Sequence, residues 1–133
     1  MKFFEYDATT HFYGLSPTAG VYALHYLPTR QRYVGESLDI FDRWNHHIFL
    51  VNSGQHPNYR LRSLRGKWDD VEFILLEEVL KTDPRLEDVP LKKILLDQQK
   101  YWILQFGSWL PIFGFNTFHE TEIRYIDSIM KRS

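Results

Sequence analysis

The residues best suited to chemistry lie close together in the first third of the chain. Tyr22 and Tyr33 stand eleven positions apart, and Arg43 and His47 follow soon after. Phenol, guanidinium and imidazole groups can bind an anion and move protons. Such a set suits a phosphodiester better than a sugar or an acyl group. We therefore expect the chain to be organised around the stretch from Gly20 to His47.

The first half of this stretch predicts an antiparallel hairpin. Val21 to Tyr26 alternates apolar and polar residues as a strand does. Residues 27–31 contain Pro28 and predict a turn, and residues 32–35 predict the returning strand. Taken without the rest of the pattern, Tyr22 and Tyr33 could simply pack across the two strands.

The second half predicts a helix that carries the charged groups. Ser37 is the predicted N-cap of a helix from Leu38 to about Asn52. Arg43 and His47 are four positions apart, so they share one helix face, and His46 borders it. In the alternative reading this face is a polar outer surface.

The ordered set of motifs resembles the GIY-YIG nuclease family. The first family signature stands as Gly20-Val21-Tyr22 and the second as Tyr33-Val34-Gly35. Arg43 lies eight positions after Gly35, where the family carries its arginine, and His47 follows four later. The resemblance covers about residues 20–116, and the family order of strands and helices continues through that range.

The resemblance implies a catalytic set: Tyr22, Tyr33, Arg43, His47, His56 and Asn116. Tyr22 would be the base, Tyr33 a second phenol near the phosphate, and Arg43 the clamp on the scissile phosphate. Either His47 or His56 would be the proton partner, since family members differ on this point. Asn116 follows an aromatic residue, as in the family's closing segment, and would reach back to the site.

A basic segment follows the predicted helix. His56-Pro57 predicts the start of a shorter helix to about Arg65, with Pro57 in its first turn. His56 could therefore cap this helix instead of serving the site. We expect the DNA-contacting residues to be the following: Gly35, Ser37, Arg60, Arg65 and Lys67.

The remaining pattern completes an α/β (α+β) fold, which is a small antiparallel three-stranded sheet flanked by helices. Residues 71–79 predict a covered third strand, and residues 90–106 predict a third helix that ends at Gly107. We divide the chain into an N-terminal extension (1–19), a nuclease-like domain (20–116) and a C-terminal extension (117–133). The last extension is predicted to be helical to about Lys131, because Thr117 and Glu120 have capping-box spacing.

One position departs from the family pattern. The family holds one divalent metal, Mg²⁺ or Mn²⁺, through a glutamate on the third helix, three residues before the pair Trp102-Ile103. That position is Gln99, whose neutral amide is a poor ligand for Mg²⁺. Asp97 would project from another side of the helix, and Glu36 is an alternative carboxylate. Either the chain has naturally lost metal-dependent cleavage, or Gln99 is an introduced, nearly isosteric inactivation.

Composition sets the remaining bounds. The chain has 133 residues, 44% of them hydrophobic and none of them cysteine, which excludes disulfides and thiolate metal sites. No apolar run approaches the ~20 residues of a membrane helix, so we expect no membrane partner and a cytoplasmic location. The net charge is -1, but residues 30–67 hold seven Lys or Arg against three acids. One basic face is therefore expected.

These observations lead to three hypotheses. The first is a metal-dependent endonuclease that cuts double-stranded DNA, of restriction, phage or mobile-element type, with a homodimer as one way to cut both strands. The second is a non-catalytic nucleic-acid-binding module on the same fold. The third is a protein-interaction domain that uses its aromatic extensions.

Overall fold

A sheet of three antiparallel strands forms the centre of the protein, as predicted. The computed structural model describes residues 2–3 and 17–117. Strand β2 (Gly20–Tyr26) lies between β3 (Gln31–Ser37) and β4 (Val71–Glu78), and both neighbours run antiparallel to it. A two-residue strand, β1 (Lys2–Phe3), adds a parallel edge to β4, so the order is β1-β4-β2-β3. Strand β3 is therefore an edge strand.

The helix after the hairpin begins later than predicted. Helix α1 spans Ile40–Asn52, and Asp39, not Ser37, is its N-cap, because the Asp39 side chain accepts from the backbone N–H of Asp42. Ser37 ends β3 and is buried. Its hydroxyl donates to Asp39 O and accepts from Asp39 N, so Ser37 holds the strand-to-helix turn instead. The predicted Ser37 cap is wrong because β3 runs two residues beyond Gly35.

The predicted helix after His56 is also wrong. Only a short 3₁₀ turn, η1 (Leu61–Leu64), forms there, followed by η2 (Trp68–Asp70). Side chains hold the preceding segment in a non-helical path. His56 Nδ1 accepts from Asn58 N, and Asn58 Oδ1 accepts from Arg60 N and Leu61 N. These local bonds compete with the backbone pattern of a helix.

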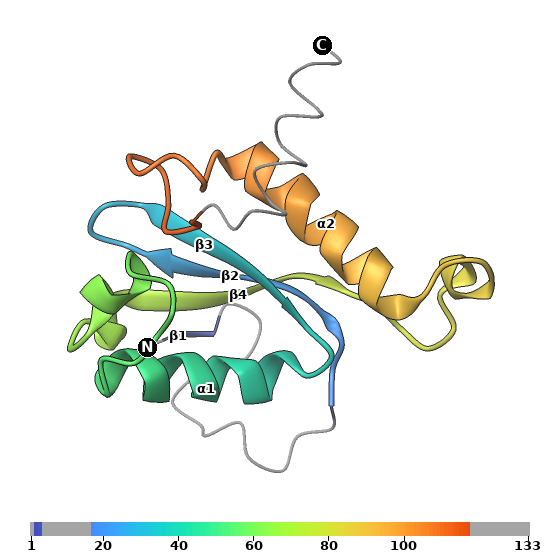
Figure 1. The fold of residues 1–133 in the computed structure, drawn as a ribbon, viewed down its shortest axis with the longest axis horizontal. Helices are drawn as coiled ribbons and strands as arrows, with labels where there is room; N and C mark the ends of the chain where they lie inside the picture. Colours follow the sequence, from blue (N-terminus) through green and yellow to red (C-terminus); the bar gives the residue numbers. More distant parts are fainter. Residues whose placement is uncertain (1, 4–16, 118–133) are drawn as a thin grey trace.

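Helices cover both faces of the sheet (Figure 1). Helix α1 packs on one face through a core that contains Tyr22, Trp44 and Phe73. Helix α2 (Leu91–Phe106) packs on the other face, where Ile103 meets Val21 and Val34. Helix α2 begins after Pro90 and ends at Gly107, which has φ 63°, as the sequence predicted. The loop before it contains one 3₁₀ turn, η3 (Pro84–Glu87).

Two predictions fall beyond the described part of the chain. The C-terminal helix and most of the N-terminal extension lie outside the described residues. Within the described ranges, no helix combines the length and the apolar character that a membrane crossing requires.

Candidate active site

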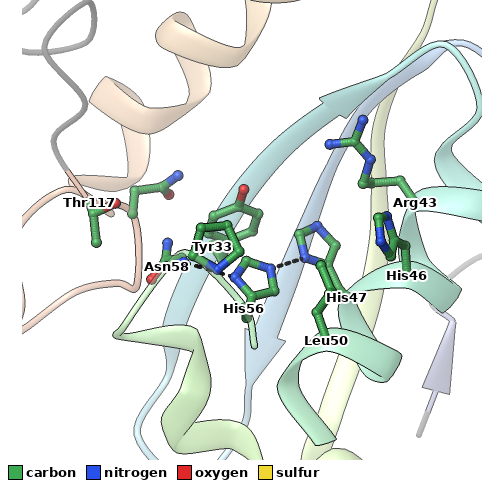
Figure 2. Close-up of a pocket in the computed structure, with 10 residues that line it drawn as sticks. Tyr33, Arg43, His46, His47, Leu50, His56, Asn58 and Thr117 are labelled. Carbon is green, nitrogen blue, oxygen red and sulfur yellow. Dashed lines mark hydrogen bonds between the residues drawn. The ribbon is translucent and has the colours of Figure 1, made fainter. Parts of the chain in front are cut away.

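One cavity gathers most of the predicted catalytic residues. It has a volume of about 350 Å³ and is formed by α1, β3, the segment 56–58 and the segment 116–117 (Figure 2). Its walls include five of the six residues in the predicted catalytic set: Tyr33, Arg43, His47, His56 and Asn116. His46, on the same helix as Arg43, lines it as well. The topology therefore brings together residues that are up to 83 positions apart in the sequence.

Tyr22 lies behind the cavity wall and is almost fully buried. Its ring stacks on Phe73 with a centroid distance of 5.2 Å, and its hydroxyl oxygen lies 2.5 Å from His47 Nε2. Tyr22 is opposite Gly35 in the hairpin, and a Cβ at Gly35 would overlap the phenol oxygen and ring. Gly35 thus allows a close approach of the Tyr22 phenol, which fills the space beside the residue that was predicted to contact DNA.

Burial of Tyr22 has an electrostatic consequence. Desolvation raises the pKa of Tyr22 well above its ordinary value, and Tyr33 adds to this effect. The Arg43 guanidinium acts in the opposite direction and lowers the pKa. Arg43 alone does not offset burial, so the phenol form is favoured near neutral pH.

The two candidate histidines form one hydrogen-bonded pair. His47 Nδ1 lies 2.7 Å from His56 Nε2, and the two rings stack at 5.0 Å with 14° between their planes. Both side chains are buried. Burial lowers the pKa of His47 well below its ordinary value, and His56 and Arg43 add to this shift. Burial, followed by Arg62, lowers the pKa of His56 to about 4. Both imidazoles are therefore neutral at pH 7.

The exposed rim of the cavity comes from α1. Arg43 and His46 are exposed on the helix that carries buried His47, and Figure 2 shows them on the same side of the cavity. Tyr33 is partly buried in the wall, and its ring meets the His47 ring edge-on at 5.3 Å. Of the two motif tyrosines, Tyr33 is thus the one that faces the cavity.

Asn116 is placed as a buried structural link. Its Oδ1 accepts from Val34 N at 2.9 Å and from Ser108 Oγ at 2.6 Å. Its Nδ2 donates to Val34 O at 2.9 Å. The amide group is therefore bonded to the outer edge of β3, next to Tyr33, and it holds one wall of the cavity.

The predicted DNA-contacting residues differ in their exposure and bonding. Ser37 is buried, and Arg60 Nη1 donates to Trp109 O at 2.9 Å and to Asn116 O at 2.5 Å. Arg65 and Lys67 are exposed, and the Lys67 ammonium lies over the Tyr26 ring at 5.8 Å. Only the last two are placed like solvent-facing phosphate contacts.

The residues at the predicted metal position do not fit a divalent metal. Gln99 Nε2 donates to Val34 O at 3.2 Å, from the α2 side of β3. Glu36 Oε1 forms an ion pair with Lys92 at 2.6 Å. Among the described residues, Glu36 Oε2 has no hydrogen-bond partner, and no group of three or more His, Asp or Glu could hold a metal ion. Mg²⁺ prefers carboxylates, and the Glu36 carboxylate is already paired with the Lys92 ammonium.

One important residue, Asn58, was missed by the sequence reasoning. Its backbone N–H bonds to His56, and its side-chain Nδ2 donates to Phe115 O at 2.9 Å. The available signal was its residue type, because an asparagine side chain commonly bonds to the backbone two residues on, as Asn58 Oδ1 does with Arg60 N. Its long-range bond to Phe115 had no sequence signal.

Comparison with solved structures gives a consistent result. The chain resembles a mutant form of the catalytic domain of the intron endonuclease I-TevI, with a TM-score of 0.60 and 25% identity over 77% of this chain and 99% of that one. It also resembles the catalytic domain of the homing endonuclease I-TevI, with a TM-score of 0.61 and 24% identity over 76% and 99%. No protein-family model and no curated protein matches the sequence. These solved domains have the GIY-YIG fold, so the predicted resemblance is confirmed.

Proposed function

We propose that this chain, which has the fold of a GIY-YIG endonuclease catalytic domain, is a nuclease domain that binds the phosphodiester backbone of DNA. One observation carries the proposal. One cavity is lined by the exposed Arg43, by Tyr33 and by the buried His47 and His56, and His47 is in turn bonded to the buried Tyr22. The arrangement offers a cation for the phosphate and hydrogen-bonding groups behind it.

The cavity residues have distinct roles in this proposal. The Arg43 guanidinium binds the phosphate, since its planar set of N–H donors matches phosphate oxygens. His46, on the same rim, is a second polar contact to the backbone. Tyr33 faces the substrate, and Tyr22 with the two histidines forms the buried support behind it. Asn116 and Arg60 hold the walls.

In this proposal, the step that is missing is metal binding. A divalent ion such as Mg²⁺ or Mn²⁺ would supply an activated water and neutralise charge on the phosphate. Gln99 removes the carboxylate that would hold it, so we expect the chain to bind DNA and not cut it. Substitution of Gln99 by Glu should be tolerated, because Val34 O keeps its bond from Asn116 Nδ2.

The test compares four proteins on supercoiled plasmid with Mg²⁺ or Mn²⁺ at low salt. They are the chain as it stands, Gln99→Glu, the matched control Gln98→Glu, and Gln99→Glu combined with Arg43→Ala. We expect nicking only from Gln99→Glu. Equal nicking by Gln98→Glu would mean that added charge, and not position 99, is responsible. Cutting by the unmodified chain would contradict the proposed role of Gln99 and direct attention to Glu36.

The second candidate is a nucleic-acid-binding module without catalysis, and the presence of Gln99 is the observation that favours it. It predicts that both the chain and Gln99→Glu bind duplex DNA with steep salt dependence and that neither cuts. Cutting of both strands by one site requires a homodimer or two visits. The order in which nicked and linear plasmid appear would separate these two.

A further inference from the structure

The direction of the buried hydrogen-bond chain can be derived from its first member. Four groups are in line: Asn58 N, the His56 ring, the His47 ring and the Tyr22 hydroxyl. Figure 2 shows the bonds among Asn58, His56 and His47. An imidazole nitrogen can donate or accept, but a backbone N–H can only donate. The backbone group at Asn58 therefore sets the direction for every later bond.

The proton positions follow one after another. Asn58 N donates to His56 Nδ1 at 2.9 Å, so that nitrogen carries no proton. The proton of neutral His56 is then on Nε2, which donates to His47 Nδ1 at 2.7 Å. His47 Nδ1 must accept, which leaves the His47 proton on Nε2. That N–H points at the Tyr22 oxygen, 2.5 Å away.

We infer that His56 is a positioning residue that fixes His47 in the Nε2–H tautomer, so that His47 donates to the oxygen of Tyr22 and does not take its proton. The catalytic meaning of this inference rests on the proposed nuclease function, whereas the tautomer itself does not. Both imidazoles are neutral at pH 7, which agrees with one proton on each ring.

The inference changes the role expected of the two histidines. The family resemblance implied that one of them is the proton partner in catalysis. In the ordered chain, every donor points toward Tyr22, and hydrogen bonds to an oxygen favour its charged form. These hydrogen bonds therefore act against burial, which raises the pKa of Tyr22. The Tyr22 hydroxyl proton is then available to an acceptor other than His47.

The tautomers can be read directly by two-bond ¹H–¹⁵N correlation NMR of the imidazole rings at pH 7.5. The chain has six histidines, and spectra of His47→Gln and His56→Gln assign the two relevant rings by the signals that disappear. We expect both rings to carry the proton on Nε2 and none on Nδ1. A proton on His47 Nδ1 would overturn the inference, whether or not the chain cuts DNA.

A pair of nearly isosteric variants tests whether His56 is the cause. His56→Gln keeps one acceptor for Asn58 N and one donor for His47 Nδ1, so His47 should stay in the Nε2–H form. His56→Glu offers only acceptors, so His47 should move its proton to Nδ1. If His47 keeps the same tautomer in both variants, His56 does not position it and the inference fails. If a variant does not fold, the NMR spectrum of the unmodified protein still shows which tautomer His47 adopts.

The catalytic consequence is measured in the Gln99→Glu background. We expect the nicking rate of His56→Glu to be about tenfold or more below that of His56→Gln, the effect of one lost hydrogen bond to a charged group. Equal nicking rates of the two variants, together with a reversed His47 tautomer, would show that the direction of the hydrogen bonds does not matter for catalysis. If no Gln99→Glu protein cuts at all, the proposed function fails, and the NMR result for the tautomer remains valid.

Discussion

Substitution of Asn116 by Ala should destabilise the protein strongly, although Asn116 was predicted as a catalytic residue. The side chain is buried and makes three hydrogen bonds, two to the backbone of Val34 and one to Ser108. Truncation leaves Val34 N and the Ser108 hydroxyl without this partner, whereas Val34 O keeps its bond from Gln99. Each buried polar group left unpaired costs about 1–3 kcal/mol.

We therefore expect Asn116→Ala to lower the free energy of unfolding by about 2–4 kcal/mol, a large part of the 5–15 kcal/mol typical of a domain. Urea denaturation followed by tryptophan fluorescence measures the change. With a urea slope of about 2 kcal/mol per M, the midpoint should fall by about 1–2 M.

Two further variants serve as controls for Asn116→Ala. Gln105→Ala removes an exposed amide from α2 and should change stability by less than about 0.5 kcal/mol. Ser108→Ala combined with Asn116→Ala should cost less than the sum of the single variants, because the double variant leaves no serine hydroxyl unpaired. A loss below about 0.5 kcal/mol in Asn116→Ala would refute the structural role.

Three other substitutions or conditions give distinct outcomes. Gly35→Ala forces its methyl group against Tyr22, so stability should fall by about 1–3 kcal/mol in urea denaturation; an unchanged midpoint would mean that the ring moves freely. Stability should also fall as pH drops from 6.5 to about 4, because unfolded His56 gains a proton in that window and folded His56 does not. In the same denaturation series, His56→Gln should reduce this dependence without removing it, because the pKa of His47 is lowered as well. Arg65→Ala should reduce the salt slope of DNA binding by about one, whereas Arg60→Ala should mainly lower stability, and the reverse pattern in a salt titration would contradict their placement.

The strands and α2 were predictable because they depend on local sequence pattern. The predicted strand 71–79 and helix 90–106 agree closely with β4 and α2. Gly107 ends α2 at positive φ, as its residue type indicates. Arg43 and His47 were predicted to share one helix face, and both lie on α1 and line the cavity.

The errors occur where a side chain competes with the backbone. Ser37 was predicted as the N-cap of α1, but β3 continues to Ser37, and Asp39 caps the helix instead. Pro57 suits the first turn of a helix, but bonds from His56 and Asn58 hold a different path. The sequence pattern gives these local alternatives similar weight, and tertiary contacts decide between them.

The edge of β3 explains why position 99 matters beyond its charge. An edge strand exposes backbone groups that need partners. At Val34 both backbone groups are satisfied by side chains: Asn116 bonds to N and O, and Gln99 bonds to O from α2. Gln99 therefore links α2 to the strand that carries Tyr33. A carboxylate at position 99 would give up this donor in exchange for a metal ligand, whereas Asn116 would still hold the strand. Position 99 thus has two roles, a bond to the edge of β3 and a predicted metal ligand. A substitution there is expected to change the proposed cleavage without removing the cavity.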